Sequence, residues 1–81
     1  MANLAVTAGR TIGRAMAKDA LQPGMPSWCR EWHGIDGDWQ RDAIRLGIVL
    51  DADSFDYDAK LVKEFNEIAK QTFINIIEAS H

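Results

Sequence analysis

The sequence predicts an all-α protein, a small irregular helical bundle with two long helices, about 3–21 and 58–79, and two short ones, about 27–33 and 38–46. Two observations predict this class. Apolar residues recur with a helical period over both long segments, and clusters of glycine, proline and aspartate separate the predicted helices. The 81 residues form a single helical domain, 1–81, because a chain of this length supports one small core.

The first predicted helix, 3–21, has an apolar face and a basic ridge. Asn3 is placed to cap its start. The apolar face is formed by residues spaced three or four apart: Leu4, Ala5, Ala8, Ile12, Ala15 and Met16. Arg10, Arg14 and Lys18 follow one another at intervals of four, so they form a basic ridge on another side of the same helix.

The same helix also has a ridge of small residues, Gly9, Gly13 and Ala17. Each glycine inside a helix costs about 1 kcal/mol relative to alanine. We expect another helix to approach closely over this ridge and offset that cost. The alternative is a helix that frays or bends at the glycines.

The segment 22–26 contains two prolines and must end the first helix. Ser27 is then expected to cap a short helix that runs to His33 and stops at Gly34. Trp28 and Trp32 would share one face of that helix, because they are four residues apart. Both Trp residues fit either a core or an exposed patch for a partner.

The second short helix, 38–46, is expected to begin with Asp38 as its cap and to end at Gly47. Trp39 follows the cap, and it too fits either the core or the surface. The apolar segment 48–50 is interpreted as a buried linker, because a strand of three residues has no evident partner here.

The last predicted helix, 58–79, has the clearest amphipathic pattern of the chain, and Asp56 or Asp58 is expected to cap it. Its apolar face comprises Leu61, Val62, Phe65, Ile68, Ala69, Thr72, Phe73 and Ile76. Ile74 projects nearly opposite this face and Ile77 lies at its margin. We therefore expect the end of this helix to be covered on more than one side. The first helix, the tryptophan segment (27–33, with Trp28 and Trp32) or a second molecule would cover it.

Composition excludes several classes of protein. The net charge of −3 argues against a nucleic-acid binder as a whole. A single cysteine, Cys29, excludes a disulfide framework and favours the reducing cytoplasm. No segment approaches the ~18 apolar residues of a membrane span, and Arg10 and Arg14 interrupt the only stretch that resembles a signal peptide.

Cys29 and His33 are the one pair with catalytic or metal-binding chemistry at helical spacing. A structural zinc site needs four ligands, and a nucleophile needs further partners, which the neighbouring sequence does not supply. The motif Asp51-Ala-Asp53 resembles the nucleophile motif of haloacid-dehalogenase-type phosphatases, but the α/β domain of those enzymes is missing. We therefore expect no enzyme, no metal and no cofactor, and we interpret Cys29 as a packed thiol beside a surface imidazole.

An acidic-aromatic segment, 51–58, is the most distinctive feature of the chain. It alternates carboxylates with aromatic rings: Asp51, Asp53, Phe55, Asp56, Tyr57 and Asp58. One interpretation is a solvated loop that caps the last helix. The other is a docking surface in which the rings act as anchors and the acids attract a basic partner, with Ile74 as a further contact.

We therefore predict a non-enzymatic protein-interaction module, an adaptor or inhibitor whose partner is another protein with a basic surface or a second copy of the chain. Its size, charge and lack of catalytic motifs resemble small phage-encoded accessory proteins, including inhibitors of CRISPR effectors. The alternative is a small nucleic-acid-associated regulator that uses the basic ridge of Arg10, Arg14 and Lys18. An enzyme or metal protein built on Cys29 and His33 ranks last.

Overall fold

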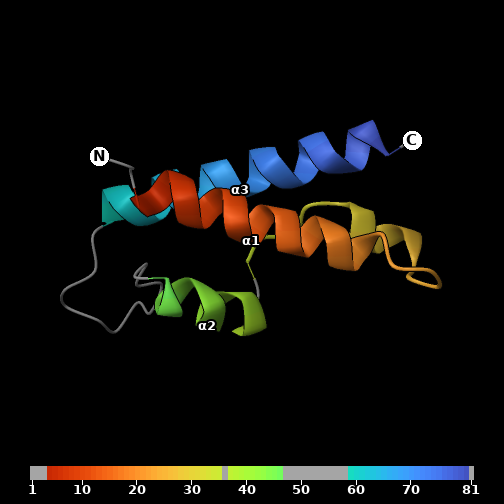
Figure 1. Ribbon diagram of the computed structural model, residues 1–81, viewed down its shortest axis with the longest axis horizontal. Helices are drawn as coiled ribbons and strands as arrows, with labels where there is room; N and C mark the ends of the chain where they lie inside the picture. Colours follow the sequence, from red (N-terminus) through yellow and green to blue (C-terminus); the bar gives the residue numbers. More distant parts are fainter. Residues whose placement is uncertain (1–3, 36, 47–58, 81) are drawn as a thin grey trace.

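A computed structural model of the chain describes residues 4–35, 37–46 and 59–80. In chain order these residues form α1 (Leu4–Ala20), the 3₁₀ helix η1 (Ser27–Arg30), α2 (Gly37–Arg45) and α3 (Ala59–Ala79). Helices α1 and α3 lie side by side along the long axis of the molecule, and α2 lies apart from α3 beside α1 (Figure 1). No strand occurs in the described ranges, so the predicted all-α class is confirmed.

The contact between α1 and α3 is unusually close because of the two glycines in α1. A Cβ atom on Gly9 would lie 2.7 Å from the Cβ of Ile68, and one on Gly13 would lie 2.5 Å from the carbonyl oxygen of Ala69. Real Cβ atoms essentially never approach another heavy atom within 3.0 Å. Only glycine fits at these two positions without displacing α3. The expected close approach over the small ridge is confirmed, and α1 continues as a helix through both glycines.

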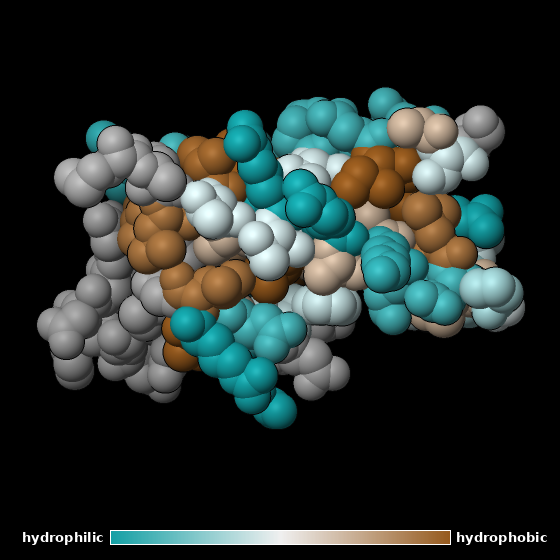
Figure 2. All heavy atoms as spheres, viewed as in Figure 1, coloured by the Kyte–Doolittle hydropathy of each residue, from teal (hydrophilic) through white to brown (hydrophobic). Residues whose placement is uncertain are grey.

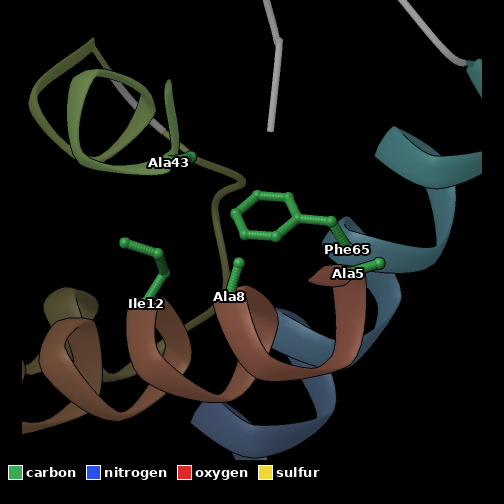
Figure 3. Close-up of a cluster of buried hydrophobic side chains, with 5 residues drawn as sticks. All are labelled: Ala5, Ala8, Ile12, Ala43 and Phe65. Carbon is green, nitrogen blue, oxygen red and sulfur yellow. The ribbon is translucent and has the colours of Figure 1, made fainter. Parts of the chain in front are cut away.

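The first core cluster fills the space between α1, α2 and the start of α3. It consists of Ala5, Ala8, Ile12, Ala43 and Phe65 (Figure 3). The fully buried ring of Phe65 extends from α3 across Ala8 of α1 toward Ala43 of α2. Alanines surround this ring because larger side chains would keep the helices apart. Phe65 is the largest fully buried side chain of the described residues, and it joins the three helices in one cluster.

A second core cluster lies at the other end of the α1–α3 pair. It is built from Ala17, Ala20, Phe73 and Ile77. The ring of Trp32, from the segment after η1, packs on Phe73 with the ring centroids 5.6 Å apart. The tryptophan segment thus covers the end of α3, one of the three coverings expected from the sequence. Ile77, at the margin of the predicted face, is buried, and Ile74 packs half-buried against the same cluster.

The prediction of a helix over 27–33 is wrong in length and type. The segment forms a four-residue 3₁₀ helix preceded by Pro26 in an extended conformation, and no side chain caps it. The chain becomes extended again at Glu31 (φ −98°, ψ 148°), so Trp28 and Trp32 do not share a helical face. A segment this short gains little from helix formation, whereas the extended path allows Trp32 to reach Phe73. Gly34, the predicted stop, has a left-handed conformation (φ +92°), but it lies beyond the end of η1.

The prediction of a helix over 38–46 is confirmed with small shifts at its ends. Helix α2 begins at Gly37, so Asp38 lies inside its first turn rather than at the cap. It ends at Arg45, and Leu46 closes it with backbone hydrogen bonds to the carbonyls of Asp42 and Ala43. The proposed stop at Gly47, the linker 48–50, the cap at Asp56 or Asp58 and the Asn3 cap lie outside the described residues.

Candidate functional site

Most of the predicted docking surface lies outside the described part of the chain. This applies to Asp51, Asp53, Phe55, Asp56, Tyr57 and Asp58, whose role in binding stays a prediction. Ile74 is described, and part of its side chain is occupied by the contact with the second core cluster. A role for the rest of that side chain in partner binding also stays a prediction.

The basic ridge of α1 is exposed over its whole length. Arg10, Arg14 and Lys18 are all exposed, and none of them takes part in the ion pairs found among the described residues. Arg14 and Lys18 line an open groove of about 380 Å³ together with Leu21 and Ile76. On the side of the molecule seen in Figure 2, hydrophilic side chains lie between two hydrophobic areas. The ridge is therefore free to meet an anionic ligand.

Large apolar side chains are exposed at the end of α2. Ile44 is 50% exposed and Leu46 is 37% exposed, whereas Ala43, one residue away, is fully buried in the first core cluster. Helix α2 therefore uses one side to contact the bundle and leaves a second apolar side uncovered. Five residues along the chain from Leu46, the acidic-aromatic segment begins at Asp51.

All four helical elements contribute to a pocket of about 270 Å³. Helix α1 supplies Met16 and Asp19, α2 supplies Trp39, and α3 supplies Phe73. The segment that includes η1 supplies the rest of the functional side chains, Trp28, Cys29, Glu31 and His33. The sequence gives no sign of this pocket, because its residues are far apart in the chain and the turn after η1 brings them together.

Cys29 and His33 both line this pocket, and the contacts of the His33 ring are with Trp28 and Glu31. The Nε2 atom of His33 lies 3.0 Å from the carbonyl oxygen of Trp28 and 3.8 Å from a carboxylate oxygen of Glu31. The His33 ring also meets the ring of Trp28 edge-on, with the centroids 6.0 Å apart. Within the described ranges, no three His, Cys, Asp or Glu side chains are grouped to hold a metal ion.

Fold and surface together define a small helical bundle with an aromatic pocket, an exposed basic ridge and an uncovered apolar side of α2. No family model, curated protein or solved structure matches this chain. A search of the described helices finds none that is long and apolar enough to cross a membrane.

Proposed function

We propose that this protein is a non-enzymatic protein-binding module of the cytoplasm, an adaptor or inhibitor that docks on a basic surface of another protein. The docking surface comprises the acidic-aromatic segment 51–58 and the exposed end of α2, Ile44 and Leu46. The observation that carries the proposal is the exposure of these two apolar side chains, which precede the segment in the chain. Exposed apolar residues beside charged ones are typical of a contact surface.

The two kinds of side chain in this surface have different roles. Phe55, Tyr57, Ile44 and Leu46 would supply apolar area that is removed from water on binding. The four aspartates would speed association with a basic partner and select against acidic ones. A nucleoprotein complex with a basic nucleic-acid groove fits this chemistry. The finer proposal is therefore a phage-type inhibitor that competes with nucleic acid for such a groove, as in a CRISPR effector.

The test removes charge from the segment in two pairs, Asp51→Asn with Asp53→Asn, and Asp56→Asn with Asp58→Asn. Asparagine retains the capping ability of aspartate, so the fold is preserved. The partner is captured from an extract of the source cell, identified, purified and titrated with each variant at low and high salt. Each pair should weaken binding by about tenfold at low salt and flatten its salt dependence, because attraction between exposed charges is screened by salt.

A charge-matched control separates the local effect from net charge. Glu67 and Glu78 are exposed on α3 and belong neither to the segment 51–58 nor to α2, and Glu67→Gln with Glu78→Gln removes two charges, as each aspartate pair does. This control should bind as the wild type does. Equal weakening by the control, or unchanged binding by both aspartate pairs, would reject the acidic docking surface.

The alternative is a nucleic-acid-associated regulator, favoured by the uncovered ridge of Arg10, Arg14 and Lys18. Three phosphate contacts predict a small salt effect, a loss of about 40-fold in affinity between 50 and 200 mM salt. A gel shift with duplex DNA at low salt that disappears in Arg10→Ala with Arg14→Ala would support this function. Absence of any shift would exclude it.

A further inference from the structure

The pocket between the four helical elements combines aromatic walls with acidic groups. Met16 and Asp19 come from the C-terminal half of α1, beside which the yellow ribbon of η1 runs in Figure 1. Trp28, Trp39 and Phe73 provide aromatic rings from three different elements. Trp28 is 61% exposed and Trp39 is half-buried, so indole surface remains available to a ligand. The face of an aromatic ring carries partial negative charge and attracts cations.

The charged groups that line the pocket are acidic. Asp19 and Glu31 contribute two carboxylates, and neither lysine nor arginine is among the lining residues. The remaining titratable side chains are Cys29 and His33, and His33 is 3.8 Å from Glu31. The carboxylate of Asp19 takes no part in the ion pairs found among the described residues. Asp19 also lies in the last turn of α1, where the helix dipole disfavours a negative charge, so it does not serve to stabilise the helix.

The size of the pocket limits what it can hold. A volume of about 270 Å³ is slightly below the range of about 300–1,000 Å³ that is typical of sites for drug-sized ligands. One side-chain head group fits this space. Aromatic rings, two carboxylates and this size favour guanidinium, which stacks on rings, pairs with carboxylates through parallel hydrogen bonds and is less strongly hydrated than ammonium.

We propose that this pocket binds the guanidinium group of an arginine side chain presented by a partner protein. The indole rings of Trp28 and Trp39 contact its flat faces, and the carboxylates of Asp19 and Glu31 accept hydrogen bonds from its edges. This inference rests on the proposed function, because it names the side chain by which a basic partner would be recognised, at a second site separate from the segment 51–58.

The test uses Nα-acetyl-argininamide as the probe and two-dimensional NMR of the ¹⁵N-labelled full chain as the measurement. The three tryptophans give three indole N–H signals, which Trp→Phe variants assign. The signals of Trp28 and Trp39 should shift and saturate with a dissociation constant on the order of 1–10 mM. Nα-acetyl-citrullinamide, which has the same shape without the charge, should cause no saturable shift. Equal shifts with both probes, or with neither, would overturn the proposal.

Variants of the pocket provide the second part of the test. Asp19→Asn with Glu31→Gln should weaken arginine binding at least fivefold, and the charge-matched Glu67→Gln with Glu78→Gln should leave it unchanged. Trp28→Ala, at an exposed position that preserves the fold, should weaken it similarly. Equal weakening by the control pair would show that only net charge matters and would refute the site. The probe needs neither the partner nor the acidic segment, so this result is independent of the test of the proposed function.

Discussion

Replacing Gly13 by alanine would test whether the close approach of α1 and α3 determines the packing of this bundle. In an isolated helix the change is favourable by about 1 kcal/mol. In this protein the new Cβ would lie 2.5 Å from the carbonyl oxygen of Ala69 and 2.9 Å from the Cβ of Thr72. Ordinary contact begins at 3.4 Å, so α3 must move away by as much as 0.9 Å at this point. The obstructing carbonyl oxygen belongs to the backbone and cannot rotate aside.

Overpacking of a core usually costs about 1–3 kcal/mol, and a shift of a whole helix lies at or above the upper end of that range. After the gain in helix propensity, we expect Gly13→Ala to lower the free energy of unfolding by about 2 kcal/mol. Urea denaturation followed by circular dichroism would measure this as a midpoint lower by about 1–2 M, from a slope of about 1–2 kcal/mol/M. The change would lower the melting temperature by roughly 8–16 °C.

The control is Thr11→Ala, at an exposed position of the same helix. It raises helix propensity without meeting α3, so it should stabilise the protein by a few tenths of a kcal/mol. Our reasoning fails if Gly13→Ala proves as stable as Thr11→Ala. In that case the two helices would be free to separate without loss of packing.

Two further predictions concern the tryptophan segment and the end of α3. Trp32→Ala removes the ring that packs on Phe73 and should lower the free energy of unfolding by about 2–3 kcal/mol. Trp28→Ala, at an exposed position, should change the free energy of unfolding by less than about 1 kcal/mol. Similar urea midpoints for the two variants would contradict this difference. Ile74→Asp places a charge against the second core cluster. It should lower the free energy of unfolding by about 1–3 kcal/mol more than Asn75→Asp, which changes the exposed neighbouring residue. Equal free energies of unfolding for the two variants would show that Ile74 makes no important contact.

Local patterns predicted the long helices well, because their information is repeated along the segment. The bounds Leu4–Ala20 and Ala59–Ala79 each differ from the predicted ones by a single residue or less at either end. The cap at Ser27 and the stop at Gly34 predict a helix over 27–33, whereas the segment forms only the 3₁₀ helix Ser27–Arg30. The actual position of Trp32 depends on Phe73, which is 41 residues away in the chain and invisible to a local pattern.

The sequence by itself determined the helical class, the close contact over Gly9 and Gly13, and the basic ridge of α1, since periodicity and residue size act within one helix. Only the tertiary structure decided which tryptophan is exposed and which is packed. It also brought Asp19, Glu31 and Trp39 to one pocket. Their convergence requires the extended backbone after η1 and the packing of the helices in the two clusters that contain Phe65 and Phe73. Such convergence depends on contacts between distant residues, and no regular spacing along the chain encodes it.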